Sequence, residues 1–426
     1  MSFLRNDMAS WTYFVLTDGS HGRPCRIARM DQTKRKRMFD HTLKPSFARQ
    51  PTPLLTLIIC VIIRVSFYHS PLSVRNCLVM AHKTRLRLPV FLLLIVTFCE
   101  QNHVHGEPKV PCYFIFGDSL VDSGNNNNLE TIAKVNYPPY GIDFPGGPTG
   151  RFTNGRTVAD IMGELLGFDD FIPSFLTVDS SEILIGVNYA SGSAGIRQET
   201  GKQLGINLEL SKQLENHQTI ISRIVDMVGI ESAASHLNKC FYWSVIGSND
   251  YLNNYFIPQY YNTSSQYTPD KYAEALIEQY SRQIMTLYNS GARKVALNGI
   301  GPIGCAPYST ANYDTKGSLC VDSMNDAVNY FNRRLKSLVN QLNNDLADAK
   351  FIYLNAVGFG SEYTASPGFS FKLNGCCKAN EHGQCVPNQT PCIFRSLNLF
   401  WDLFHPTEVS NKLSALLSYR SLKKIL

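Results

Sequence analysis

A serine, an aspartate and a histidine lie near opposite ends of this chain, in settings that suit nucleophilic catalysis. Ser119 follows a short apolar run, residues 112–116, which predicts a buried strand that ends at Gly117. Near the other end, Asp402 lies three residues before His405. This spacing lets the carboxylate accept from Nδ1 of the imidazole while Nε2 faces a substrate. A serine nucleophile needs such a base, and the base needs an orienting acid.

Each half of this pattern also has a purely structural interpretation. Gly117 and Asp118 alone are typical of a turn, with Ser119 as a helix cap. Asp402 and Thr407 alone are typical of residues that cap a C-terminal helix, because Asp-x-x-His is a weak pattern. The body has three further histidines, which fall in a helix, a loop and a cysteine-rich segment: His217, His236 and His382.

An acyl-transfer site also needs donors for the charge that develops on the substrate oxygen. The candidates are the backbone N–H of Ser119, the backbone N–H of Gly192 and the side-chain amide of Asn249. Gly192 would allow close approach of the backbone, and Asn249 directly follows an apolar run, residues 240–246. Taken singly, Gly192 and Asn249 are more typical of ordinary turns.

Short apolar runs alternate with amphipathic segments of helical length between residues 107 and 426. The expected strands are residues 112–116, 186–190, 240–246, 295–297 and 351–354. The expected helices are residues 157–166, 207–227, 269–289 and 322–348. This alternation predicts a three-layer α/β/α domain with a central parallel sheet. Because the carboxyl ends of parallel strands share one edge, the polar loops that begin at Gly117, Ser191, Gly247 and Asn298 are expected to meet there.

The positive charge of the chain belongs to its first part. The 426 residues carry a formal net charge of +6, of which residues 1–79 contribute +8 and residues 80–106 contribute +2. The predicted domain is therefore left with −4. A basic leader ahead of an acidic domain gives no support for nucleic-acid binding.

Residues 80–106 have the layout of a secretory signal peptide, with a basic segment, an apolar core at 88–98 and small residues before 107. We therefore expect translation to start at Met80 and residues 1–79 to be a disordered upstream extension. The alternative is a genuine long leader, which targets an organelle or anchors the chain through residues 54–63. Both apolar runs are too short to span a bilayer, so the mature protein is expected to be secreted without a membrane span.

Cysteine usage agrees with export. Eight of the twelve cysteines lie in the predicted domain, and an even number in an exported chain indicates disulfides. Cys305 with Cys320, and pairs within residues 376–392, are the local candidates. His382 lies in the second group, which leaves zinc as an alternative. Sequons at Asn262 and Asn388 predict N-glycans on surface loops.

Four motifs occur in a fixed order: Gly117-Asp-Ser-Leu120, Asn188-Tyr-Ala-Ser-Gly192, Gly247-Ser-Asn-Asp250 and Asp402-Leu-Phe-His405. Together they resemble the plant GDSL esterase/lipases of the SGNH hydrolase superfamily, over residues 110–420. The resemblance implies a flavodoxin-like sheet and no metal or organic cofactor. One departure is Ser193, where the family usually has a second glycine. We expect Ser193 to leave the Gly192 amide available and to narrow the pocket slightly.

The resemblance also implies roles for the candidate residues. Ser119 would attack an ester carbonyl, His405 would carry the proton and Asp402 would orient His405. Ser119, Gly192 and Asn249 would form the oxyanion hole. The implied protein is an extracellular serine esterase of the cell wall or apoplast, acting on lipid, cutin-like or acetylated polysaccharide esters. Alternatives are an acyltransferase that uses the same residues and a catalytically silent binding protein. Asp118 and Asp250 are expected to be structural.

Overall fold

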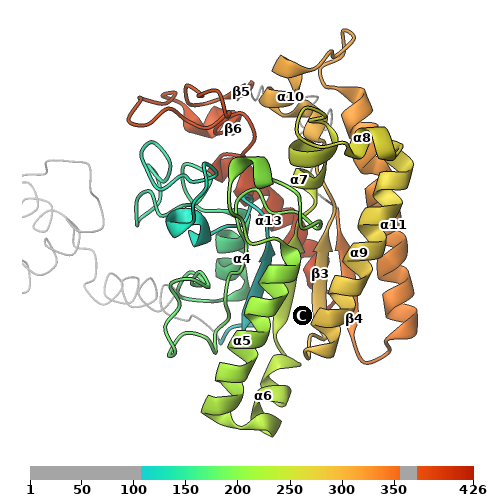
Figure 1. Ribbon diagram of the computed structural model, residues 1–426. Coiled ribbons are helices and arrows are strands. Elements are labelled where there is room, and N and C mark those ends of the chain that lie inside the picture. The colour runs from blue at the N-terminus through green and yellow to red at the C-terminus, as the bar shows by residue number, and fades with distance from the viewer. Residues whose placement is uncertain (1–106, 356–371) are drawn as a thin grey trace, which may run out of the picture. The chain divides into compact units, whose positions relative to one another are not determined.

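The computed structural model describes residues 107–355 and 372–426, shown in colour in Figure 1. The segments expected at 1–79 and 80–106 lie outside the described residues. Four parallel strands form the central sheet in the order β1-β2-β3-β4. Their bounds are β1 Tyr113–Gly117, β2 Phe241–Val245, β3 Lys294–Asn298 and β4 Lys350–Leu354. Four of the five predicted strands are therefore present.

The fifth predicted strand, residues 186–190, is an irregular edge segment. It pairs with β1 through a parallel bridge between Ile115 and Asn188, and Ser191 N–H donates to the Gly117 carbonyl oxygen. The segment begins at Gly186, which has φ +119° and lies so close to β1 that a Cβ there would be 2.0 Å from the Tyr113 carbonyl oxygen. With this segment beside β1, the sheet has the flavodoxin-like order 2-1-3-4-5.

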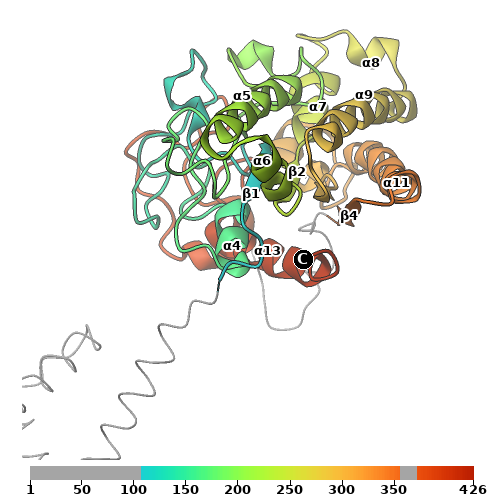
Figure 2. The same ribbon diagram turned by 90° about the horizontal axis from the view of Figure 1, so that it is seen from below.

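Helices cover both faces of the sheet, as the view along it shows (Figure 2). One layer contains α5 (Leu210–Val228), α6 (Ile230–Leu237), α9 (Pro269–Asn289) and α11 (Asp322–Asp345). The opposite layer contains α4 (Val158–Leu166) and α13 (Glu408–Leu422), which pack against each other. The predicted three-layer α/β/α arrangement is confirmed.

Local sequence explains where the predicted helices begin and end. Thr157 caps α4 in a reciprocal capping box with Asp160, and Gly167 ends the helix at φ +96°. The Thr268 side chain caps α9, and Pro269 occupies its first position, where no N–H is needed. These signals set the lengths of the crossovers and therefore the places where the strands can pair.

The strands are buried on both faces, which explains their continuous apolar sequences. Phe114, Tyr242 and Val295 belong to the core beneath α5, α9 and α11. Their neighbours Ile115 and Trp243 belong to the separate core beneath α4 and α13. Burial on both faces fixes the register, because a one-residue slip would exchange the two sets of side chains.

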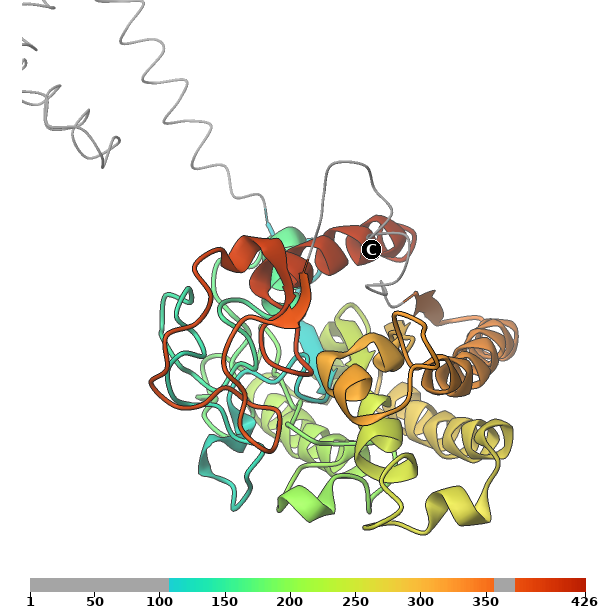
Figure 3. The same ribbon diagram turned by 90° about the horizontal axis from the view of Figure 1, so that it is seen from above.

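The shorter elements gather over the carboxyl end of the sheet (Figures 1 and 3). They are α7 (Ser248–Asp250), a π-helical turn (Tyr251–Tyr255), α8 (Thr263–Gln266), α10 (Pro307–Asn312), β5 (Lys372–Gly375) and β6 (Asn398–Phe400). Within the described residues, no helix is long and apolar enough to cross a membrane.

All eight cysteines of the domain form disulfides. The expected Cys305–Cys320 bridge is present, and the C-terminal group pairs as Cys376–Cys392 and Cys377–Cys385. The fourth bridge, Cys112–Cys240, joins the starts of β1 and β2. The two sulfur atoms lie close to a ring nitrogen of His236, but they are bonded to each other and are not available as thiolate ligands for a metal. The C-terminal thiols are likewise unavailable as zinc ligands.

Candidate active site

A tight turn after β1 presents Ser119 at the carboxyl edge of the sheet. Asp118 N–H continues the pairing to the Val245 carbonyl oxygen, and Val121 N–H then returns to the Asp118 carbonyl oxygen. A Cβ at Gly117 would lie 2.4 Å from the Val245 carbonyl oxygen, so only glycine fits this approach. Ser119 is 9% exposed and lines a cavity.

A second turn, directly after β6, carries Asp402 and His405. Trp401 N–H donates to the His405 carbonyl oxygen at 2.7 Å, which closes the turn. Oδ1 of Asp402 accepts from the backbone N–H groups of Phe404 and His405, at 2.8 Å and 2.7 Å. Oδ2 then lies 2.7 Å from Nδ1 of His405, and Nε2 of His405 lies 2.8 Å from Oγ of Ser119. The structure therefore brings the three predicted residues into one hydrogen-bonded line.

Tyr140 is a further partner of this line. Its hydroxyl donates to Oδ2 of Asp402 at 2.6 Å and accepts from the N–H of Cys385 at 3.1 Å. Burial and the Asp402 charge raise the pKa of the Tyr140 hydroxyl well above its ordinary value, so it remains a donor. Phe152 packs against the His405 ring with centroids 4.8 Å apart. Sequence spacing gave no signal for either aromatic residue.

Two of the predicted oxyanion donors are available at the cavity. Among the described residues, the N–H of Ser119 has no acceptor. Nδ2 of Asn249 donates one hydrogen to the Ala194 carbonyl oxygen at 2.9 Å, and the side chain lines the cavity. Nδ2 carries two hydrogens, so one is left for a substrate.

The predicted role of Gly192 needs correction. Its N–H points to Oδ2 of Asp122 and Oδ1 of Asn126, each at 3.1 Å, and is not available to a substrate. A Cβ at position 192 would lie 2.7 Å from both the Asn126 side chain and the Phe152 ring. Glycine is therefore required there by packing, and the expectation that its amide serves the substrate is wrong.

Ser193 lines the cavity in its place. It has φ +64°, a left-handed conformation that costs a non-glycine residue about 1–2 kcal/mol. Asn207 holds it there, because Nδ2 donates to both the carbonyl oxygen and Oγ of Ser193, at 3.2 Å and 3.1 Å. Within the described part of the chain, the N–H of Ser193 has no acceptor.

Three buried carboxyl groups surround these loops. Desolvation raises the pKa of Asp118 to about 7, and those of Asp122 and Asp250 to about 6. Asp250 accepts from the N–H groups of Ile196 and Arg197, so it holds the loop beyond Ser193. Asp118 accepts from the N–H of Leu120, and within the described residues it makes no hydrogen bond to the Ser119 hydroxyl. Both positions are consistent with the structural roles expected for Asp118 and Asp250.

The cavity above Ser119 has a volume of about 410 Å³, a size typical of small-molecule sites. Its apolar lining comes from loops around the carboxyl edge: Leu120, Ile132, Leu204, Leu252, Ile257 and Phe404. Its polar lining includes several amides: Gln203, Asn249, Asn253 and Gln384. Ile132 and Tyr260 line the cavity and are also 44% and 64% exposed, which gives the cavity an apolar mouth.

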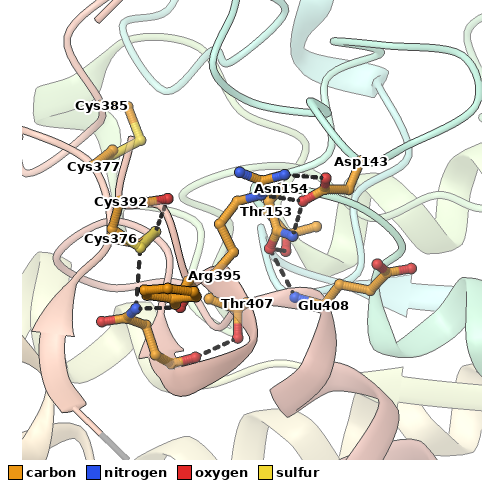
Figure 4. Close-up of a disulfide and its surroundings, with 12 residues drawn as sticks. Asp143, Thr153, Asn154, Cys376, Cys377, Cys385, Cys392, Arg395, Thr407 and Glu408 are labelled. Carbon is orange, nitrogen blue, oxygen red and sulfur yellow. Dashed lines mark hydrogen bonds and ion pairs between the residues drawn. A yellow bond between two sulfur atoms is a disulfide. The ribbon is translucent and has the colours of Figure 1, made fainter. Parts of the chain in front are cut away.

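The cysteine-rich segment, whose two disulfides are drawn in Figure 4, is hydrogen-bonded to the turn that carries Asp402. Cys376 N–H donates to the Trp401 carbonyl oxygen at 2.9 Å. A disulfide joins Cys376 to Cys392. Three residues after Cys392, Arg395 pairs with both carboxylate oxygens of Asp143, each at 2.7 Å. Asn154 in turn donates to Asp143 and accepts from the N–H that begins α13. The segment thus fixes the Asp402 turn against the loop that contains Tyr140 and Phe152.

Comparison with known proteins places the chain in a family. The model of the GDSL-like Lipase/Acylhydrolase family matches residues 113–417. GDSL esterase/lipase At1g29660 from Arabidopsis thaliana is 52% identical over 325 residues, which are 75% of this chain and 89% of that protein. GDSL esterase/lipase At1g29670, from the same plant, is 52% identical over 339 residues, which are 78% and 93%. The chain belongs to the GDSL esterase/lipase family. This GDSL esterase/lipase is accordingly a carboxylic ester hydrolase.

The family assignment agrees with the resemblance predicted from the four motifs. Among solved structures, a phospholipase A1 from Streptomyces albidoflavus NA297 aligns with a TM-score of 0.29 and 12% identity, over 74% of this chain and 100% of its own. That likeness is too low to bear on the esterase's fold or substrate. The parallel sheet β1-β2-β3-β4 and the helices packed on it are seen in this GDSL esterase/lipase itself.

Proposed function

We propose that this GDSL esterase/lipase is a secreted serine esterase that uses Ser119, His405 and Asp402 and forms an acyl-enzyme. The single observation that carries the proposal is the unbroken line of short hydrogen bonds from Oγ of Ser119 through the imidazole to Oδ2 of Asp402. A serine hydroxyl in such a line can lose its proton as it attacks a carbonyl carbon.

The reaction proceeds in two acyl transfers. Oγ of Ser119 attacks the ester carbonyl, and its proton passes to Nε2 of His405. The imidazolium then gives this proton to the departing alkoxide, which leaves as the alcohol. Water attacks the acyl-enzyme, His405 takes one of its protons and returns it to Oγ, and the carboxylic acid is released. Asp402 accepts from Nδ1–H throughout, so Nε2 remains the atom that exchanges protons.

The tetrahedral oxyanion is held by three N–H groups: those of Ser119 and Ser193 in the backbone and that of the Asn249 side chain. The backbone donor at position 193 replaces the one first expected at Gly192, because only the former is free of internal acceptors. Removing one oxyanion donor lowers turnover by ~10²–10³-fold, so Asn249→Ala should be nearly inactive.

The cavity favours an ester with an apolar acyl chain. Its apolar lining begins beside Ser119 at Leu120 and continues to the exposed Ile132 and Tyr260 at its mouth. Burying apolar surface there would stabilise each added methylene of the acyl group by about 0.8 kcal/mol. We therefore place lipid or cutin-like esters ahead of acetylated polysaccharides as substrates.

Export is supported by the disulfides and by the sequons. Four bridges tie the domain, which is typical of proteins that fold in an oxidising compartment. Asn262 and Asn388 are both exposed, so each is accessible to a glycan. Residues 80–106 would act as the signal peptide, and residues 107–426 would form the extracellular enzyme.

The test is hydrolysis of p-nitrophenyl acetate, octanoate and laurate by protein recovered from the medium of a secreting plant host. The full reading frame supplies the leader, and Ser119→Ala is expressed in parallel. We expect octanoate and laurate to be cleaved faster than acetate by the wild type, and none of them to be cleaved by the variant. Unchanged hydrolysis by folded Ser119→Ala would falsify the proposal. N-terminal sequencing of the same material locates the mature start.

A further inference from the structure

A chain of side-chain hydrogen bonds leads from Asn249 away from the cavity. Nδ2 of Asn253 donates to Oδ1 of Asn249 at 2.7 Å, and Nε2 of Gln203 donates to Oδ1 of Asn253 at 3.0 Å. The hydroxyl of Tyr261 donates to Oε1 of Gln203 at 2.6 Å. We call these four side chains, Asn249, Asn253, Gln203 and Tyr261, the amide relay.

The direction of the relay is fixed at its inner end. Nδ2 of Asn249 lies 2.9 Å from the Ala194 carbonyl oxygen, which can only accept. Oδ1 of Asn249 must therefore face Asn253, and Asn253 must donate to it from its NH₂ group. Oδ1 of Asn253 then faces Gln203 and can only accept, so Gln203 must present its NH₂ group to Asn253. Oε1 of Gln203 is therefore the atom that faces the hydroxyl of Tyr261. Reversal of any one amide would set two oxygen atoms against each other.

The backbone at Asn253 is itself unusual. Asn253 lies in the π-helical turn Tyr251–Tyr255, where its φ of −115° and ψ of 25° depart from helical values. Single π-helical turns occur frequently at functional sites, because they redirect a side chain. The N–H of Gly201 donates to the Asn253 carbonyl oxygen at 3.1 Å, which holds this conformation. The turn keeps Asn253 within reach of Asn249 while it lines the cavity.

We propose that Asn253 is a positioning residue for ester hydrolysis, and that it keeps an N–H of Asn249 directed at the developing oxyanion. The inference rests on the proposed oxyanion role of Asn249. A carboxamide presents an oxygen and an NH₂ group of nearly equal size, so its orientation is selected by its hydrogen-bond partners, which for Asn249 are the Ala194 carbonyl oxygen and the NH₂ group of Asn253. In the reversed orientation, Oδ1 of Asn249 would face the oxyanion and repel it. Gln203 holds Asn253 in the orientation that prevents this, because its NH₂ group donates to Oδ1 of Asn253, and catalysis needs such donors to be set before the reaction.

Asn253→Asp tests the inference with almost no change in shape. The carboxylate cannot donate to Oδ1 of Asn249, so it draws the NH₂ group of Asn249 toward itself and away from the oxyanion. We expect kcat to fall by ~10–10³-fold, up to the full loss of one oxyanion donor, with KM within about twofold of the wild-type value. A purely structural role would change the unfolding midpoint without this separation of kcat from KM.

Gln203→Glu provides a second test that does not alter a neighbour of Asn249. A glutamate at 203 requires a donor from Asn253, and Asn253 would then turn its oxygen toward Asn249. We expect the same fall in kcat, somewhat smaller, and this variant carries the test if Asn253→Asp does not fold. Gln218→Glu, an exposed amide-to-acid change on α5, is the matched control and should leave kcat unchanged.

The Asn249→Ala background separates this inference from the proposed function. There Asn253→Asp should change kcat by less than about twofold, because coupled residues do not add. An equal fall in both backgrounds, or wild-type kcat in Asn253→Asp and Gln203→Glu, would overturn the relay while leaving the esterase assignment intact. Hydrolysis that survives Ser119→Ala would instead remove the proposed function itself.

Discussion

The hydroxyl of Tyr140 lies 2.6 Å from Oδ2 of Asp402, the oxygen that also faces Nδ1 of His405 at 2.7 Å. Tyr140 accepts in turn from the N–H of Cys385. The carboxylate that orients the proposed base is therefore oriented itself by a buried ring, which is tied to the cysteine-rich segment.

We predict that Tyr140→Phe lowers both stability and turnover. The variant keeps the ring but removes one donor from a fully buried carboxylate, and a hydrogen bond to a charged group is worth about 1.5–3 kcal/mol. The free energy of unfolding should fall by that amount, and kcat should fall about tenfold because Asp402 and His405 lose alignment. Denaturant titration and initial rates on p-nitrophenyl octanoate measure the two effects.

Tyr137→Phe is the matched control. Its hydroxyl donates to the carbonyl oxygen of Cys385 at 3.1 Å, one peptide away from the Tyr140 contact, and does not touch Asp402. A neutral bond of this kind is worth about 0.5–1.5 kcal/mol, and kcat should stay within twofold of wild type. Equal rates for Tyr140→Phe and Tyr137→Phe would show that the hydroxyl on Asp402 has no part in turnover.

A second prediction concerns the corrected role of Gly192. An added Cβ would lie 2.7 Å from the Phe152 ring, which itself packs against the imidazole of His405. Gly192→Ala keeps the backbone N–H, so a steric effect is the expected cause of any loss. We expect kcat to fall by ~10²-fold, in line with the effect of a 1 Å displacement on catalysis.

The double variant Gly192→Ala/Phe152→Leu distinguishes a steric effect from a lost donor. Leucine at 152 relieves the contact with the ring, while the 2.7 Å approach to the Asn126 side chain remains, so the double variant should be more active than Gly192→Ala alone but less active than wild type. Phe152→Leu alone gives the reference for its own effect on His405. A double variant no more active than Gly192→Ala would argue against collision with the ring.

Much of the fold could be predicted because the relevant signals are local. Residues 112–116 and 240–246 are apolar without alternation, which is the mark of strands buried on both faces. Thr157 and Thr268 each act through a hydrogen bond three residues ahead, so helix starts follow from short-range sequence. The edge segment at 186–190 has the same short apolar sequence, and its backbone hydrogen bonds to Ile115 and Gly117 place it beside β1.

The site was predicted less completely, because its supporting contacts are distant in sequence. Ser119 and the Asp402-x-x-His405 spacing are visible locally, and their order matched a family. Tyr140 lies 262 residues before Asp402, so no spacing connects them. Whether Gly192 or Ser193 offers a backbone N–H to the oxyanion depends on where each N–H points. The N–H of Gly192 donates to Asp122 and Asn126, which lie on another loop.

The Cys377–Cys385 bridge gives a third prediction. It joins cysteines with a sequence separation of 8 and holds the peptide whose N–H donates to the Tyr140 hydroxyl. The variant Cys377→Ser/Cys385→Ser should lose about 2–3 kcal/mol of stability and several-fold in kcat.

Cys112→Ser/Cys240→Ser removes a bridge with a sequence separation of 128 at the opposite end of the strands. Its stability loss should be larger, at roughly 4–5 kcal/mol, with kcat of the folded protein unchanged. The reverse ranking of the two kcat values would contradict the support assigned to Cys385.

The last prediction concerns pH and a histidine remote from Ser119. His217 is fully buried on α5 against Phe114, Phe116 and Tyr242. Nδ1 lies 2.9 Å from the Tyr189 hydroxyl, and within the described residues Nε2 has no partner. Burial lowers the pKa of His217 to about 3, so the folded protein holds it neutral.

The sign of its effect on stability follows from linkage. Below about pH 6.5 the unfolded chain binds a proton at His217 that the folded chain does not, so the stabilisation is complete above that pH and is lost as the pH falls toward about 3. His217→Phe keeps a ring but does not titrate. The unfolding free energy of wild type minus that of the variant should fall by about 1.4 kcal/mol per pH unit below about pH 6.5. The buried carboxyls of Asp118, Asp122 and Asp250 are present in both proteins and cancel in this difference. Urea titrations of both proteins at about pH 7.5, 6 and 5 measure it, and a difference independent of pH would mean that His217 gains its proton without unfolding.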